Sequence, residues 1–143
     1  PETAETTQLF NISKEEYEAR AALVESAYIY KGCAIAVSGE LAPGMSVVLP
    51  MAANDLLTIN GVDASFVAVQ VGNGVNVSAR SMGAVNVQVI MESLGGGGHQ
   101  TMAAAQLKHI TPQAARSRIQ DAIDQYYLSQ KKTTPEARPA KGE

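Results

Sequence analysis

The sequence predicts an α/β domain in which a mixed β-sheet carries helices packed on it. Strand-like and helix-like segments alternate along the chain, and a hairpin signal lies among them. A chain of 143 residues with 45% hydrophobic residues can also bury one sizeable core. We expect the folded domain to span residues 13–129, preceded by a linker at 1–12 and followed by a disordered tail at 130–143.

The first predicted element is a helix. Ser13 and Glu16 have the spacing of a capping box, so the helix should begin directly after Ser13. Gly32 is expected to end it. Apolar residues at helical spacing predict a buried face that consists of Tyr17, Ala21, Val24 and Tyr28.

Strands and one short helix are expected in the middle of the chain. Residues 33–37 indicate a buried strand, 46–49 a short second strand and 51–59 a short helix. Residues 65–71 favour a strong strand, and the turn at 72–74 leads into another. On that last strand one face should carry Val75, Val77 and Ala79, and the other Asn76, Ser78 and Arg80.

The last part of the chain is expected to hold three helices and one strand. Asn86 can cap a helix that continues to Leu94. Beyond it we expect a short helix at 99–104 and a strand at 105–110. Thr111-Pro112 is typical of a helix start, and the buried face of that final helix is predicted to consist of Ala115, Ile119, Ala122, Ile123 and Tyr126.

Four consecutive glycines, from Gly95 to Gly98, are the strongest indication of function. They lie between two predicted helices and deliver His99 to the start of the second. Glycine lets the backbone approach a ligand closely and direct several N–H groups at one anion. A helix start would add unpaired N–H groups and a partial positive charge. We therefore expect a phosphate site here, with a flexible linker as the alternative.

Arg80 and Ser78 are the expected partners of this loop. They share one strand face, close to the point where Ser81 turns toward the glycine-bearing helix. A guanidinium group matches the geometry of phosphate oxygens, and the hydroxyl of Ser78 can add a neutral contact. The alternatives are a surface salt bridge for Arg80 and a capping or structurally bonded role for His99.

A complete catalytic set is not visible in the sequence. His99 and His109 lie on different predicted elements and lack metal-ligand spacing, and Cys33 lies far from both in the sequence. Asp121 and Asp124 fall opposite the apolar face of the final helix, where we expect them to be solvated. A net charge of -3 without a Lys/Arg cluster argues against duplex nucleic acid as a partner.

The sequence also bears on location. A single cysteine cannot form an internal disulfide, which favours a reducing, cytoplasmic setting. No signal peptide is visible, and no apolar run approaches the roughly 18 residues needed to span a bilayer. Since the first residue is Pro1 rather than Met, we expect a processed or excised chain.

Five segments become informative when they are read together: Tyr30–Ala36, Leu56–Phe66, Ser78-Ala79-Arg80-Ser81, Asn86–Met91 and Gly95–His99. Together they resemble the C-terminal subdomain of DHH-type phosphoesterases. More narrowly, they resemble the cyclic-di-AMP phosphodiesterases of the GdpP (YybT) family. The resemblance covers about residues 13–127, and the glycine-rich run with its histidine is the most specific part.

The resemblance implies a bipartite enzyme. A DHH subdomain of the same chain would hold two manganese ions (Mn2+), and cyclic-di-AMP would be hydrolysed to pApA by metal-activated water. The sequence lacks an Asp-His-His motif, so we expect no catalytic residue, metal or cofactor in this chain and no hydrolysis by it alone. The resemblance assigns substrate binding to Gly96, Gly97, Gly98 and His99, and to Arg80 with Ser81 at the end of the neighbouring strand.

The resemblance also implies that the parent protein is anchored in the bacterial cell membrane, with this domain in the cytoplasm and PAS and degenerate GGDEF domains upstream. Three alternatives stay open. One is a nanoRNase that acts on short linear oligoribonucleotides. Another is an RNA-binding module like the C-terminal domain of alanyl-tRNA synthetases, against which the acidic balance counts. The third is a dimerisation domain, and a homodimer of the intact protein is left open.

Overall fold

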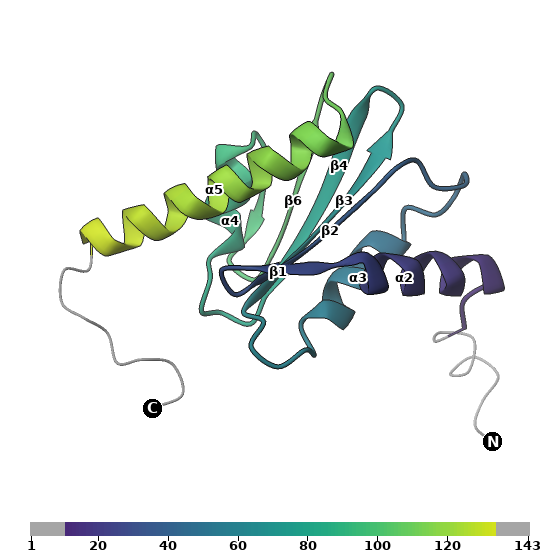
Figure 1. Ribbon diagram of the computed structural model, residues 1–143, viewed down its shortest axis with the longest axis horizontal. Helices are drawn as coiled ribbons and strands as arrows, with labels where there is room; N and C mark the ends of the chain where they lie inside the picture. Colours follow the sequence, from purple (N-terminus) through teal and green to yellow (C-terminus); the bar gives the residue numbers. More distant parts are fainter. Residues whose placement is uncertain (1–10, 134–143) are drawn as a thin grey trace.

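The computed structural model describes residues 11–133, which form one six-stranded sheet with helices on both faces (Figure 1). The strands are β1 (Tyr28–Tyr30), β2 (Cys33–Ser38), β3 (Ala64–Val71), β4 (Gly74–Ser81), β5 (Gly97–His99) and β6 (Met102–Leu107). The helices are α2 (Lys14–Ser26), α3 (Val48–Leu56), α4 (Val87–Ser93) and α5 (Pro112–Thr133).

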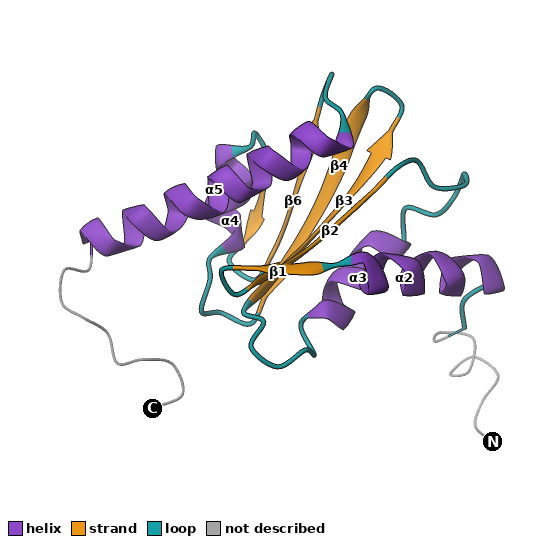
Figure 2. Ribbon diagram, viewed as in Figure 1, coloured by secondary structure: helices purple, strands orange, loops and turns teal. Residues whose placement is uncertain are grey.

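The sheet, drawn in orange in Figure 2, is mixed. Its strands lie in the order β1-β2-β3-β4-β6-β5. β2 and β3 are parallel, whereas every other neighbouring pair is antiparallel. The expected α/β class with a mixed sheet is therefore confirmed.

Each face of the sheet has its own hydrophobic core. On one face, α4 and α5 pack over β2, β3, β4 and β6, and Phe66, Ile90 and Ile119 are among the fully buried side chains. On the other face, α2 and α3 pack over β2 and β3, around Leu56 and Val67, and α3 also contacts β4. This second layer of helices leaves β6 and β5 uncovered, so one side of the sheet is only partly closed.

Several local signals were predicted correctly. Ser13 and Glu16 form both hydrogen bonds of a capping box. The side chain of Asn86 accepts from the first N–H groups of α4, and Thr111 Oγ1 accepts from Ala114 N at the start of α5. The predicted buried face of α5 is buried at all five positions: Ala115, Ile119, Ala122, Ile123 and Tyr126.

The end and the buried face of the first helix were predicted wrongly. α2 ends at Ser26 rather than at Gly32, because residues 28–30 form β1 and pair with β2 across a tight turn. Tyr17 is 62% exposed, whereas Leu23 is buried. α2 packs mainly against α3, so it needs only a narrow apolar contact.

Two short segments were assigned the wrong type of structure. Residues 46–49, expected as a strand, lead into α3, where Val48 and Leu49 join the same core as Leu56. Residues 99–104, expected as a helix, form the β5–β6 hairpin instead. Along β6 buried and exposed residues alternate, which is the period of a strand.

The final helix is longer than expected. α5 continues to Thr133, past the predicted end of the domain at residue 129. Most of the expected linker and tail lies outside the described residues.

Candidate functional site

The part of the sheet beside α3 is the candidate functional site: α3 packs against β4, where Ser78 is buried, whereas β6 and β5 carry no helix on this side. Residues directly opposite each other on paired strands point to the same face. Arg80 and His99 both lie opposite Met102, while Ser78 and Gly97 both lie opposite Ala104. We call this surface the open face, and its residues are Asn76, Ser78, Arg80, Gly97, His99, Met102, Ala104 and Gln106.

Arg80 supplies a positive charge to the open face, and no carboxylate of the described residues neutralises it. The guanidinium is half-buried and donates one hydrogen bond, from Nη1 to the carbonyl of Ala79 at 3.1 Å. Among residues 11–133, no carboxylate forms an ion pair with it. Burial lowers the pKa of Arg80, although the group stays charged at neutral pH. Its unused donors can therefore bind an anion.

Ser78 adds a hydroxyl to the same face. The residue is 8% exposed, and its hydroxyl makes no hydrogen bond with another described residue. It lies between Arg80 and Asn76 along β4. Opposite it, Ala104 and Gly97 continue the row with a methyl group and no side chain at all. The centre of the open face is thus lined by small groups.

His99 lies at the outer edge of the open face, and its position differs from the prediction. It ends the edge strand β5, directly before the turn into β6, rather than starting a helix. The expected contribution of a helix N-terminus to an anion site is therefore wrong. Its imidazole is exposed and forms no hydrogen bond with another residue of the described range, so it neither caps a helix nor supports the fold.

The backbone geometry requires glycine at three of these four positions, and the helix start that was expected after them plays no part. Gly95 has φ of +89° and ends α4, and Gly98 has φ of +147°. A Cβ on Gly98 would lie 2.5 Å from the carbonyl oxygen of Met102, and one on Gly96 would collide with that of Ala104. A Cβ on Gly97 would meet nothing within 4 Å. Gly96 and Gly98 therefore allow β5 to approach β6, whereas Gly97 leaves the open face bare.

An open depression of about 400 Å³ continues from these glycines along the edge of β6. Gly95, Gly96, Ala104, Gln106 and Lys108 are among the residues that line it. It exists because β5 is only three residues long and covers only the first part of β6. The open face therefore extends around the edge of the sheet.

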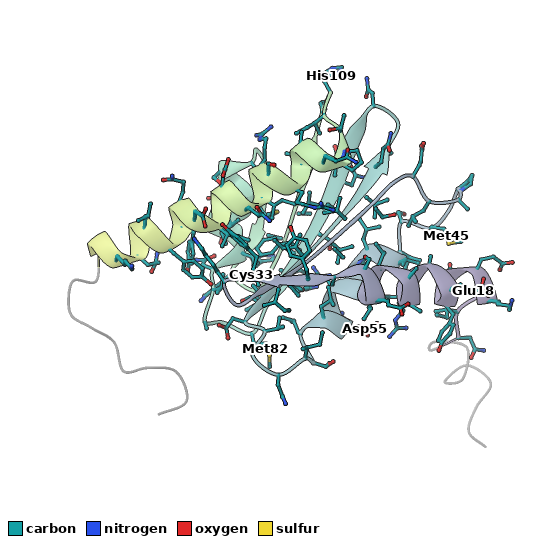
Figure 3. The ribbon with its side chains drawn as sticks, viewed as in Figure 1. Glu18, Cys33, Met45, Asp55, Met82 and His109 are labelled. Carbon is teal, nitrogen blue, oxygen red and sulfur yellow. The ribbon has the colours of Figure 1, made fainter. Side chains whose placement is uncertain are left out.

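Ser81 does not join the other predicted binding residues. It is 6% exposed, and its Oγ donates to Val85 O at 2.6 Å and accepts from Gly83 N at 3.0 Å. Since Ser81 follows Arg80 on the strand, its side chain points to the opposite face. In this structure Ser81 holds the loop at 82–85, at whose start Met82 is labelled in Figure 3.

Other residues weighed from the sequence lie elsewhere. Figure 3 shows His109 at one end of the sheet, where its Nδ1 lies 3.2 Å from Nδ2 of Asn73. Cys33 is fully buried, and burial raises the pKa of its thiol to about 11. Neither residue reaches the open face. Within residues 11–133, no three His, Cys, Asp or Glu side chains gather as metal ligands, and no helix is long and apolar enough to cross a membrane.

Asp124 is not simply solvated, as was expected. Its carboxylate accepts from Tyr30 Oη at 2.9 Å and from Lys31 Nζ at 2.7 Å. These contacts hold the pKa of Asp124 below its usual value, with Lys31 the larger cause. Asp124 therefore connects α5 to the β1–β2 turn, while Asp121 is exposed.

The model of the DHHA1 domain matches residues 44–128, which include every strand and helix around the open face. The chain belongs to the DHHA1 family. The resemblance expected from the sequence is thereby confirmed, and the open face is a surface of a DHHA1 domain.

Two relatives of this DHHA1 domain are cyclic-di-AMP phosphodiesterases. GdpP of Geobacillus thermodenitrificans is 46% identical over 128 residues, which cover 88% of this chain and 20% of the relative. PdeA of Listeria monocytogenes is 43% identical over 129 residues, which cover 87% of this chain and 20% of the relative. The DHHA1 domain is therefore homologous to the C-terminal part of such enzymes and spans about a fifth of their length.

A solved structure with the same fold is the exopolyphosphatase-related protein from Bacteroides fragilis. Its TM-score is 0.72 at 18% sequence identity, and the match covers 83% of this chain and 37% of that chain. At this identity the likeness supports the DHHA1 fold and nothing about the ligand.

The residues of the open face were only partly found from the sequence. Ser78, Arg80 and the glycines were singled out, whereas Met102, Ala104 and Gln106 were not. The sequence signal that was missed is the alternation of apolar core residues with other residues along β6, where Ala103, Ala105 and Leu107 are buried. A period of two from 102 to 107 would have placed the other three residues on the opposite face.

Proposed function

We propose that this DHHA1 domain is the substrate-binding part of a cyclic-di-AMP phosphodiesterase, and that its open face binds a phosphate of cyclic-di-AMP or of the product pApA. The observation that carries the proposal is Arg80, a half-buried guanidinium that pairs with no carboxylate of residues 11–133. The activity of the two relatives supports the identity of the ligand. The net charge of -3 does not oppose it, since the site needs only one local cation.

The open face offers the contacts that a phosphodiester needs. Phosphate oxygens accept hydrogen bonds from Arg80 and from the hydroxyl of Ser78, and His99 can donate from the edge. A charge-assisted hydrogen bond of this kind contributes about 1.5–3 kcal/mol. Because Gly97 and Ala104 are small, the ligand can lie close to the backbone of the sheet.

The described residues do not fit a metal site, so no hydrolytic step is assigned to them. Their part is to bind and orient the substrate. Under the proposal, the metal ions, expected to be Mn2+, and the attacking water belong to a DHH subdomain of the intact protein. That subdomain would face the open face across the ligand, and the parent protein would be anchored in the bacterial membrane.

Isothermal titration calorimetry of the chain with cyclic-di-AMP and with pApA tests this proposal. We expect weak but measurable binding, because few contacts must offset the cost of immobilising the ligand. Arg80→Ala should abolish it. A matched control is Arg116→Ala, since Arg116 lies over the ring of Tyr28, away from the open face. Undetectable binding of both ligands would contradict the proposal, as would manganese-dependent hydrolysis by this chain alone.

A further inference from the structure

A second cavity lies at the other end of the open face, beneath the loop that joins β2 to α3. Its volume is about 320 Å³, at the lower end of the range for small-molecule sites. Leu41, Met45, Leu49 and Val69 give it apolar walls. Polar side chains of the lining are Glu40, Ser46, Gln70 and Asn76. We call this cavity the loop pocket.

Asn76 belongs to both the loop pocket and the open face. It is half-buried, and its carboxamide makes no hydrogen bond with another described residue. A carboxamide carries a donor and an acceptor side by side, which match the N6 amino group and N7 of adenine. Planar purine rings also suit apolar walls such as those of Leu41 and Val69. The pocket thus has the chemistry of a base site.

The charges favour a base over a phosphate in this pocket. Glu40 is the only charged residue of its lining, and one of its carboxylate oxygens accepts from Gly72 N at 3.2 Å. A carboxylate repels a phosphate at close range, whereas it tolerates a neutral base. The cation of the open face, Arg80, lies at the opposite end of the same row.

The spacing suits a single nucleotide. Asn76 and Arg80 are four residues apart on β4, which corresponds to about 13 Å along an extended strand. This is comparable with the long dimension of an adenosine monophosphate. Ser78 lies between them and points to the same side. A nucleotide whose phosphate contacts Arg80 can therefore place its base at Asn76.

We propose that the loop pocket is a purine subsite, which holds an adenine base of the nucleotide whose phosphate lies on Arg80. This inference rests on the proposed function, because it takes Arg80 as the phosphate site. It adds a specificity determinant, Asn76, and gives the substrate a direction along β4.

The test compares AMP with ribose 5-phosphate, which carries the phosphate but no base, in NMR titrations of the chain. We expect the wild-type chain to bind AMP at least tenfold more tightly. Asn76→Ala should weaken AMP binding about tenfold and leave ribose 5-phosphate binding unchanged. The matched control is Gln113→Ala, because Gln113 is an exposed carboxamide on α5, outside both the loop pocket and the open face. This control should bind both ligands like the wild type.

A second variant keeps the test independent of the stability of Asn76→Ala. Ala42 lines the pocket and is exposed, so Ala42→Trp can obstruct the cavity without entering either core. It should also weaken AMP binding selectively. Equal affinity of the wild type for the two ligands, with both lost in Arg80→Ala, would overturn the purine subsite and leave the proposed function standing. Failure of the wild type to bind either ligand would overturn both, and an equal loss in Gln113→Ala would overturn the subsite.

Discussion

Arg80 of β4 and His99 of β5 lie opposite the same residue, Met102 of β6. The two cation-capable side chains are therefore brought to one row of the open face by the β5–β6 hairpin rather than by a helix terminus. This arrangement separates side chains that line the open face from groups that hold the sheet together. The following predictions use that separation.

Under the proposed function, replacing Arg80 by alanine in the intact protein should lower kcat/KM for cyclic-di-AMP about 100-fold, because a charge-assisted contact to the substrate is lost. The melting temperature should stay close to that of the wild type, since no carboxylate of the part that the structure describes would lose an ion pair with Arg80. Steady-state kinetics and thermal unfolding together check both expectations. Wild-type kinetics in the variant would refute the role of Arg80.

The glycines should differ sharply in their tolerance of a methyl group. Gly98→Ala is expected to destabilise the domain by about 2 kcal/mol or more, because its Cβ would meet the backbone of β6 and its φ is positive. Gly96→Ala should be at least as damaging. Gly97→Ala is the control and should unfold like the wild type, since its Cβ has free space. Urea unfolding curves measure the three values, and equal stabilities would contradict the packing described.

The thiol of Cys33 should be unreactive in the native domain. Burial raises its pKa from 9.0 to about 11, so almost no thiolate exists at pH 8. A thiol reagent such as dithionitrobenzoate should react only after denaturant is added, and the unfolded chain supplies the reference rate. Reaction of the native domain at that reference rate would contradict this expectation.

The same thiol should make the domain less stable in alkali. A raised pKa in the folded state means that stability is complete below pH 9 and falls as the pH rises toward 11. The decrease from Cys33 amounts to about 2 kcal/mol over that window. Urea unfolding at several pH values should show a shallower decline for Cys33→Ala. Identical slopes would exclude Cys33 as a cause.

Asp124 should make the domain sensitive to acid. Contacts with Lys31 and Tyr30 hold its pKa below the usual value, so its stabilising effect is present above that usual value and is lost as the pH falls through the folded-state pKa. Asp124→Asn should therefore lower the melting temperature at pH 7 and reduce its dependence on pH below 4. Asp121→Asn is the matched control, because Asp121 is exposed on the same helix. Equal effects of the two substitutions would contradict the assignment.

The elements that were predicted best from the sequence are those that depend only on residues nearby in the chain. The capping box at Ser13 and the apolar stripe from Ala115 to Tyr126 are fixed by neighbours within a few turns of helix, and the structure confirms both. The alternation along β4 was equally readable, because it needs only a period of two.

The wrong predictions concern segments whose structure depends on contacts with residues far away in the sequence. Gly97 to His99 become a strand only because β6 offers its edge, and neither glycine nor the alanines of β6 have strong strand propensity. Without that pairing, a small-residue run after glycines is indistinguishable from a helix start. The loop pocket was likewise invisible, since its walls come from the loop at 40–46, from α3 and from two strands.

The half-covered sheet has a consequence for how this domain can diversify. On β6, Ala103, Ala105 and Leu107 belong to the core under α4 and α5, while Met102, Ala104 and Gln106 between them touch no core. Neighbouring residues of β6 therefore meet different requirements, because one must fit the core and the next is exposed on the open face. Every second residue of this strand can therefore change among related proteins without altering the core, so the chemistry of the open face can vary while the fold keeps its stability.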